Sequence, residues 1–245
     1  MRRSNRRAAG SLLRLRQRYP KETIPEKYGT EEGDAVDGTA EAPRGYTLPM
    51  ALALLKEPPL SPPAGLGPYR RADYETLPDE PRCELILGRF YVSPSPSIVH
   101  QVVAALLYQH LYAIARATRG KAYIAPLDVT LADHSVIQPD TFYVSAQRRA
   151  ILRERIEGVP DLVIEVLSPG TARRDRGEKL ALYAAMGVPE YWIADGLERQ
   201  IEFLVNEGGR FVVGLPENGV YRSCVLPEIQ IDLAAFWTRV EEDLA

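Results

Sequence analysis

The segment PDLVIEVLSPG, residues 160–170, constrains the fold more than any other part of the chain. Its apolar positions are typical of a strand that is buried on both faces: Leu162, Val163, Ile164, Val166 and Leu167. Glu165 interrupts this run, and a carboxylate is seldom fully buried unless a partner compensates its charge. We therefore expect Glu165 either to lie at a site where the strand ends or to pair with a cation.

Strand and helix patterns on both sides of this segment predict a mixed α/β fold. Upstream, the sequence indicates a hairpin with its turn at 87–88, a long helix over 97–117 capped by Ser97, and two strand runs joined at 133–135. Downstream, Thr171 is expected to begin a helix that Gly187 closes, followed by a strand over 189–195 and a hairpin turning near 206–209. This order predicts a mixed sheet with flanking helices, of the α/β or α+β class.

Composition divides the chain near residue 67. Residues 1–67 combine an arginine-rich start with small, acidic and proline-rich stretches that offer little apolar surface to bury, so we expect a flexible extension there. Residues 68–245 are expected to form one domain. The first 21 residues contain seven arginines, one lysine and no acid, whereas the whole chain has a net charge of −3. The net-acidic remainder argues against strong nonspecific binding of nucleic acid, although a local basic strip is compatible with it.

Several classes of protein are disfavoured by the residue counts. Two cysteines, Cys83 and Cys224, do not make a disulfide framework and favour free thiols in a reducing, cytoplasmic compartment. Three histidines show no zinc-binding spacing. The most apolar run, which starts at Val102, contains Gln109 and His110 and is shorter than the roughly 20 residues of a membrane span. We expect a buried helix there and no membrane partner.

Asp140 lies inside a second strand pattern, VIQPDTFYV, upstream of Glu165. If the two strands are neighbours, about 4.8 Å apart, the two carboxylates would repel each other unless a cation lies between them. A hard divalent ion such as Mg²⁺ suits carboxylate ligands together with water and substrate phosphate. The alternative is that both carboxylates are strand-end charges paired with arginines.

A family resemblance adds to this interpretation. Pro139-Asp140 followed by Glu165 in the next strand resembles the PD-(D/E)XK nuclease superfamily. More closely, the chain resembles the Uma-two family of restriction-endonuclease-like proteins from about Asp73 to Phe236. The resemblance is carried, in order, by DYETLP, CELILGRFYVSPSPS, QPD, PDLVIEVLSPGT, DRGEKLALYAAMGVPEYWIAD and the closing hairpin.

The resemblance implies a restriction-endonuclease-like core that hydrolyses phosphodiester bonds of DNA with Mg²⁺ or Mn²⁺, and it leaves homodimer formation open. Asp140 and Glu165 would be the metal ligands. The sequence departs from the superfamily motif because Leu167 stands where a lysine is expected two residues after the glutamate. Lys179, on the following helix, is the natural substitute; the alternative is an Asp175–Lys179 pair on the helix surface. A catalytically inert nucleic-acid-binding or assembly module on the same fold is the rival function.

Two further residues gain a catalytic assignment from the resemblance alone. Glu84 is expected near the metal, whereas its position in the sequence would by itself suggest an edge-strand charge facing water. His100 is also expected at the site, with a packing role in the helix as the alternative. Asp128 is a weaker candidate for a third ligand because Pro126 indicates a bend beside it. Arginines after both strands, at 148–155 and 173–176, are expected either to contact phosphates or to be a solvated surface.

Overall fold

The structure of the protein, a computed structural model, describes residues 65–245. The predicted N-terminal extension, residues 1–67, lies outside the described residues except for its last three. The strands are divided over three sheets, of five, six and two strands. The mixed α/β class predicted from the sequence is confirmed, and the helices flank the six-stranded sheet.

The five-stranded sheet has the order β2-β1-β5-β4-β7. Its strands are β1 (Cys83–Ile86), β2 (Arg89–Val92), β4 (Val129–Ala132), β5 (Ser135–Ile137) and β7 (Ile156–Glu157). The predicted hairpin joins β1 to β2, and its two turn residues, Leu87 and Gly88, have φ of 50° and 76°. A turn of this kind requires positive φ at both central positions, which explains the glycine. The short helix α3 (Arg71–Tyr74) precedes this sheet.

The six-stranded sheet has the order β11-β10-β9-β8-β6-β3. Its strands are β3 (Lys121–Ile124), β6 (Thr141–Val144), β8 (Leu162–Val166), β9 (Glu190–Asp195), β10 (Gln200–Glu207) and β11 (Arg210–Gly214). β8 and β9 are parallel, and the crossover between them contains α5 (Ala172–Arg174), the π-helical turn η2 (Asp175–Lys179) and α6 (Leu180–Ala185). All five residues of β8 are buried, as the apolar run predicted.

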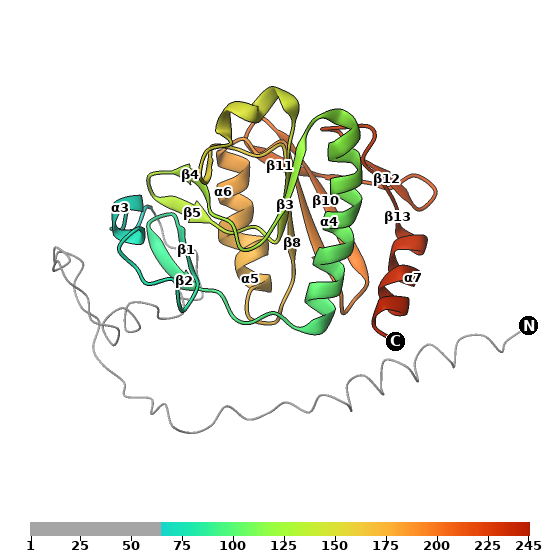
Figure 1. Ribbon diagram of the computed structural model, residues 1–245, viewed down its shortest axis with the longest axis horizontal. Coiled ribbons are helices and arrows are strands. Elements are labelled where there is room, and N and C mark those ends of the chain that lie inside the picture. Colours follow the sequence, from blue (N-terminus) through green and yellow to red (C-terminus); the bar gives the residue numbers. More distant parts are fainter. Residues whose placement is uncertain (1–64) are drawn as a thin grey trace, which may run out of the picture. The chain divides into compact units, whose positions relative to one another are not determined.

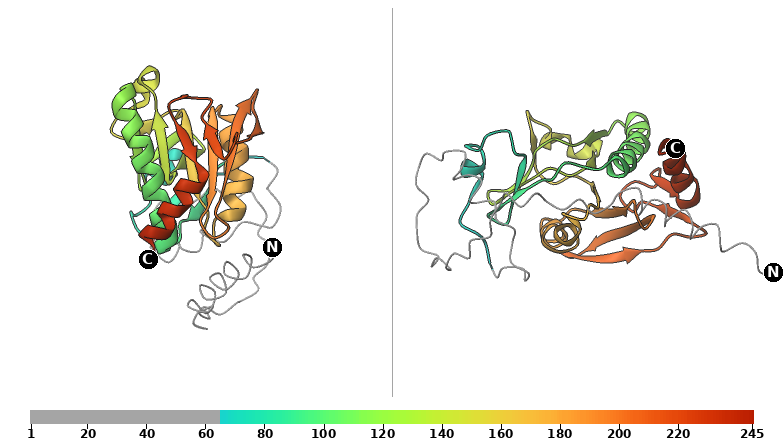
Figure 2. Two further views of the ribbon diagram at one scale, coloured as in Figure 1. Left: turned by 90° about the vertical axis from the view of Figure 1, so that its right-hand side faces the viewer. Right: turned by 90° about the horizontal axis from the view of Figure 1, so that it is seen from below.

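Helices cover both faces of the six-stranded sheet. α4 (Ile98–Thr118) lies on one face and α6 on the other (Figure 1; Figure 2, left). Alternate residues of β8 point to the two faces: Leu162, Ile164 and Val166 pack in the core with α4, and Val163 packs in the core with α6. Glu165 therefore points toward α6 and the five-stranded sheet.

Two connections differ from the sequence expectation. Each of the two strand runs around residues 133–135 divides into two strands: β4 and β5 pair in the five-stranded sheet, while β3 and β6 pair in the six-stranded sheet. Prolines at 126 and 139 lie where the chain passes between the sheets, and proline cannot donate to a strand ladder. Thr171 precedes α5, but its hydroxyl bonds to Ser168 and does not cap the helix.

The C-terminal part adds elements that the sequence patterns did not predict. These are the two-stranded sheet of β12 (Val220–Arg222) and β13 (Gln230–Asp232) and the helix α7 (Leu233–Asp243). Earlier in the chain, the 3₁₀ turn η1 (Ala146–Ile151) follows β6. α4 is long and apolar enough to cross a membrane by length and composition alone. In this fold Val103, Leu107 and Leu111 of α4 are fully buried against the sheet, so α4 is a core helix.

Candidate active site

Asp140 and Glu165 lie side by side where β6 meets β8. The two strands are antiparallel, and Thr141 pairs with Ile164, so the next pair in the register is Asp140 with Glu165. Directly opposed residues of an antiparallel pair are about 4.5–5.5 Å apart at Cα and share a face of the sheet. The structure thus brings together the two carboxylates that the sequence predicted at one site.

Asp140 is oriented by two donors. Its Oδ2 accepts the backbone N–H of Val166 at 2.7 Å and lies 3.2 Å from Nε2 of His100. His100 comes from the first turn of α4, where its backbone N–H is capped by Ser97. Burial would lower the pKa of His100, but the hydrogen bond and charge of Asp140 outweigh it and raise that pKa. The structure places His100 at the site predicted for it, against Asp140.

Lys179 reaches Glu165 from the crossover helix. Its Nζ lies 2.8 Å from Glu165 Oε1, 2.9 Å from Glu84 Oε1 and 3.8 Å from Asp175 Oδ1. The π-helical turn that contains Asp175 and Lys179 buries both side chains, and such turns are frequent at functional sites. The alternative Asp175–Lys179 pair is therefore buried. Lys179 thus places an ammonium group beside Glu165, which Leu167 at the motif position cannot do.

Glu84 belongs to one buried cluster of charged side chains with Asp140, Glu165, Asp175 and Lys179, and it is not an exposed edge charge. Its side chain is 3% exposed, and its Oε1 accepts the backbone N–H of Gln138 at 2.8 Å as well as the Lys179 ammonium. The alternative, an edge-strand charge that faces water, does not hold because β1 lies inside the sheet, between β2 and β5. The cluster consequently stands at the junction of the two large sheets.

Four acidic side chains, Glu84, Asp140, Glu165 and Asp175, lie around one lysine in this cluster. Burial raises the pKa of Glu165 well above its ordinary value, although the nearby Lys179 ammonium opposes this, and burial raises the pKa of Asp175 to about 6. Burial would lower the pKa of Lys179, but the charges of Glu165, Glu84 and Asp175 outweigh it and raise that pKa. Lys179 is therefore protonated at neutral pH, and one ammonium faces three buried carboxylates besides Asp140.

A cavity of about 320 Å³ opens onto this cluster. It is lined by Asp140, Glu165, Asp175, Glu84, Lys179 and His100, together with Arg82 and Gln101 among others. The oxygen Asp175 Oδ1 is buried without a hydrogen-bond donor. Within residues 65–245, hydrogen bonds and ion pairs reach only Oδ2 of Asp140 and Oε1 of Glu165, which leaves one oxygen of each carboxylate without a protein donor.

These residues fit a hard divalent cation in part. Asp140 and Glu165 could each supply one oxygen, and a cation there would favour the ionised form of the carboxyl groups. In the part of the chain that the structure describes, no three His, Cys, Asp or Glu side chains converge as a ready-made metal cage. Mg²⁺ commonly binds through one or two carboxylates and completes its shell with water and substrate phosphate, so two protein ligands are sufficient.

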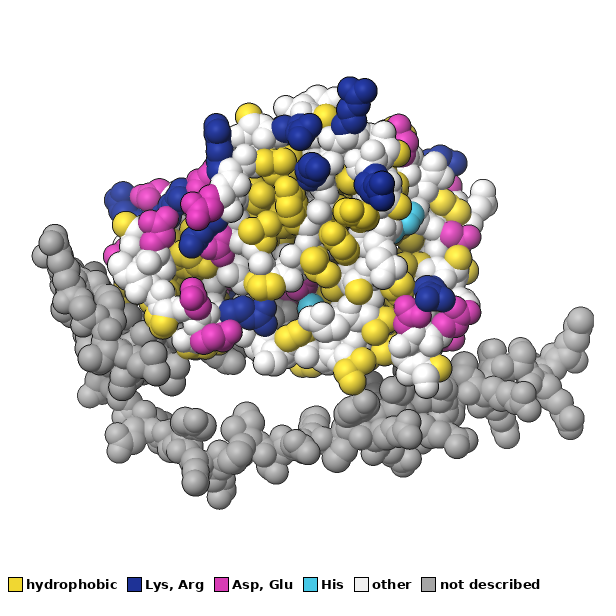
Figure 3. All heavy atoms as spheres, in the orientation of Figure 1, with side chains coloured by type: hydrophobic (Ala, Val, Ile, Leu, Met, Phe, Trp, Pro, Cys, Tyr) yellow, Lys and Arg dark blue, Asp and Glu magenta, His cyan; other side chains and the backbone are white. Residues whose placement is uncertain are grey.

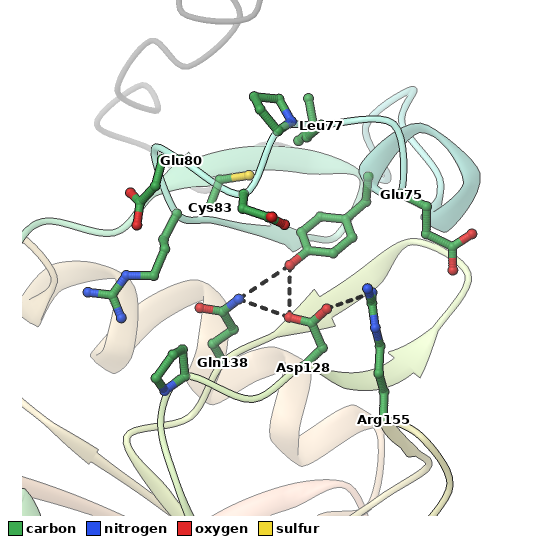
Figure 4. Close-up of a pocket in the computed structure, with 12 residues that line it drawn as sticks. Glu75, Leu77, Glu80, Cys83, Asp128, Gln138 and Arg155 are labelled. Carbon is green, nitrogen blue, oxygen red and sulfur yellow. Dashed lines mark hydrogen bonds and ion pairs between the residues drawn. The ribbon is translucent and has the colours of Figure 1, made fainter.

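Asp128 lies beside this cavity and does not line it. A neighbouring pocket of about 350 Å³ shares Arg82, Pro126 and Gln138 with the cavity. There Asp128 accepts hydrogen bonds from the Gln138 amide at 2.9 Å and from Arg155 at 2.8 Å, as the dashed lines in Figure 4 show. It also accepts one from the Tyr74 hydroxyl at 2.9 Å. With these three donors Asp128 has a structural role in the wall between the two pockets, and the structure does not bring it to Glu165.

Three of the seven arginines expected around the carboxylates pair with acidic side chains, and a fourth lies over an aromatic ring. Arg148 pairs with Asp161 at 3.1 Å, Arg155 with Asp128 at 2.8 Å and Arg176 with Glu202 at 2.6 Å. The guanidinium of Arg174 lies over the Tyr91 ring at 4.4 Å. These four side chains are thus not a free phosphate-binding rim.

Three residues of the site were not identified by sequence reasoning as functional. Asp175 was considered only as a surface partner of Lys179; Tyr183 donates its hydroxyl to Glu165 Oε1 at 2.6 Å; and Arg82 lines the cavity. Asp175 and Tyr183 do share a signal in the sequence: together with Lys179 they recur every four residues, which is the spacing of one helix face. Arg82 had no such signal.

The chain is similar to one family of proteins and to a solved structure. Residues 71–234 match the family model Uma2, described as "Putative restriction endonuclease". A solved structure described as a "putative nuclease belonging to DUF820" from Anabaena variabilis ATCC 29413 superposes with a TM-score of 0.59 at 20% identity, covering 71% of this chain and 99% of that one. At this identity the superposition supports the fold alone. No curated protein sequence matches the chain. The family match spans most of the described residues, and the chain therefore belongs to the Uma2 family.

Proposed function

We propose that this protein is a metal-dependent endonuclease that hydrolyses phosphodiester bonds of DNA. The observation that carries the proposal is the register pair Asp140–Glu165, with one oxygen of each carboxylate free of protein donors and Lys179 bonded to the other oxygen of Glu165. Asp140 and Glu165 would hold Mg²⁺ or Mn²⁺. When bound, the ion would supply Lewis-acid stabilisation of the negative charge that builds up on the scissile phosphate.

The protein's own groups have separate tasks in this proposal. Lys179 is protonated, so it would not act as a base; it would hold the Glu165 carboxylate in place and offer positive charge to the phosphate. His100 would fix the orientation of Asp140 through Nε2. Glu84 and Asp175 would position the Lys179 ammonium between them. In the hydrolysis, a water oxygen forms a bond to phosphorus while one ester P–O bond breaks, and the leaving oxygen takes up a proton.

The rival function, an inert nucleic-acid-binding or assembly module, was suggested by Leu167 at the motif position. The ammonium of Lys179 supports the enzyme instead, because it supplies to Glu165 the charge that the motif lysine would have supplied. A cytoplasmic location and a homodimer remain parts of the same proposal.

Cleavage of supercoiled plasmid DNA with Mg²⁺, with Mn²⁺ and with a chelator tests the proposal. We expect cleavage only with metal, a loss of at least ~100-fold for Glu165→Gln, and activity retained by Glu202→Gln, which removes an exposed carboxylate elsewhere. Equal activity of Glu165→Gln and wild type, or no cleavage of DNA under any of these conditions, would rule the proposal out.

A further inference from the structure

A second basic region lies at the far end of α4 from the carboxylate cluster. A hollow of about 600 Å³ is lined there by Arg116, Arg119, Lys121 and Arg149, together with Tyr112, Ala115, Gly120 and Ala122. No acidic side chain lines it. In Figure 3 lysine and arginine side chains gather along the upper edge of the molecule, over the end of α4 and the η1 turn. The positive charge of this hollow favours the binding of a polyanion.

The four cations of the hollow are not compensated by protein acids. Within residues 65–245, none of Arg116, Arg119, Lys121 and Arg149 has an ion pair, and all four are exposed. Seven other arginines within residues 65–245 do have such pairs: Arg70, Arg71, Arg148, Arg155, Arg176, Arg199 and Arg239. Four unpaired cations around one hollow repel one another, and an anion would relieve this repulsion.

The local backbone holds these cations together. α4 ends at Thr118, the following residue Arg119 has a left-handed φ of 62°, and the chain turns directly into β3 at Lys121. Gly120 makes this turn possible, because a Cβ there would collide with the ring of Tyr143. Arg116, Arg119 and Lys121 are thereby fixed on two rigid elements, and η1 adds Arg149 from the other side.

The helix α4 contributes residues to both the active-site cavity and the hollow. Gln101 lines the cavity, and Tyr112 and Arg116 line the hollow. α4 contains no aspartate or glutamate, so no negative charge on this helix interrupts the path. From His100 to Arg116 the helix rises about 24 Å at ~1.5 Å per residue, which equals roughly seven nucleotide steps of ~3.4 Å.

We propose that the hollow binds backbone phosphates of the nucleic-acid substrate, which lies along α4 with its scissile phosphate in the cavity. The proposal rests on the nuclease function and adds a footprint to it: one substrate of at least about eight base pairs occupies both places. An acidic protein partner is the competing occupant. Nucleic acid is favoured because one acid-free helix, α4, contributes residues both to the hollow and to a cavity that suits a phosphodiester.

Binding of a fluorescent 20-base-pair DNA duplex, measured by anisotropy against salt concentration with Ca²⁺ present, tests the inference. The hollow variant is Arg116→Gln/Arg149→Gln. The matched control is Arg210→Gln/Arg222→Gln, which removes two exposed arginines of β11 and β12. Each phosphate contact contributes about 0.9 to the slope of log K against log salt concentration. We therefore expect the hollow variant to lose up to about 1.8 of that slope and to bind at least ~10-fold more weakly at 0.1 M salt, with little change for the control.

The outcomes separate this inference from the proposed function. If the hollow variant loses affinity and salt slope as predicted but wild type cleaves no DNA, the inference stands and the nuclease proposal falls. If wild type cleaves DNA while both variants change affinity and salt slope equally, the hollow is not a phosphate site and the nuclease proposal stands. Absence of DNA binding by wild type, or displacement of DNA by polyglutamate at equal charge concentration, would also overturn the inference.

Discussion

Lys179→Met should destabilise the folded protein in a pH-dependent way. Lys179 Nζ is within 2.8–3.8 Å of three carboxylate oxygens, and its side chain is 5% exposed. Removing one partner of a buried ion pair typically costs about 3–5 kcal/mol of the free energy of unfolding, because the remaining charges stay buried. For a domain of this size that cost corresponds to a melting temperature lower by roughly 6–20 °C at pH 8.

The pH dependence follows from the carboxyl groups that remain. Asp175 already has a pKa of about 6 with the lysine present, and burial raises that of Glu165 as well. Without the ammonium these pKa values rise further above those of the unfolded chain. A group with a raised folded-state pKa loses its stabilising contribution as pH rises from the unfolded pKa through the folded one. The deficit of the variant should therefore be small at pH 4–5 and grow through pH 6 to pH 8.

Scanning calorimetry at several pH values measures this directly. Lys121→Met, which removes an exposed lysine, serves as the control and should melt like wild type. Added Mg²⁺ should restore more stability to Lys179→Met than it adds to wild type, since a cation compensates the same carboxylates. A melting temperature of Lys179→Met equal to that of wild type at pH 8, or a deficit independent of pH, would refute the electrostatic account of the cluster.

Three other substitutions, of which only that of Tyr183 is at the site, test buried contacts by thermal unfolding. Glu190→Gln should cost roughly 2–4 kcal/mol, because its buried carboxylate accepts from three side chains and two backbone N–H groups, and an amide cannot accept from all of them. Tyr183→Phe should cost about 1.5–3 kcal/mol by removing the donor to Glu165. Gly120→Ala should cost about 1–3 kcal/mol, since the new methyl group meets the Tyr143 ring. Losses below ~0.5 kcal/mol would contradict each of these estimates.

The elements with strong local patterns could be predicted from the sequence. The hairpin at Leu87-Gly88, the α4 helix with its Ser97 cap and the buried strand containing Glu165 each have a local cause, namely a turn residue, a cap or an apolar run. The pairing of Asp140 with Glu165 was an inference from two strand patterns, and the β6–β8 register supplied its geometry.

What could not be predicted depends on contacts between distant segments. The burial of Glu84 results from the pairing of β1 with β5, which no local pattern of β1 encodes. The division of two strand runs between two sheets is likewise a tertiary property. The hollow around Arg116 and Arg149 joins residues 33 positions apart that no shared motif connects.

A calorimetric scan with and without Mn²⁺ tests the central claim, that Asp140 and Glu165 together hold a divalent cation. Wild type should melt roughly 5 °C or more higher at saturating Mn²⁺, since a ligand at 100 times its Kd adds about 2.7 kcal/mol. Asp140→Asn should lose this shift and keep its metal-free stability, because its amide oxygen can still accept from Val166 and one like charge beside Glu165 is gone.

The control for that scan is Asp161→Asn. Asp161 is buried and accepts from Ser145 at 2.7 Å and Arg148 at 3.1 Å, so this substitution should destabilise the protein and leave the Mn²⁺ shift intact. The claim is contradicted if wild type shows no shift with Mn²⁺ while Asp140→Asn, without metal, melts several degrees lower than wild type.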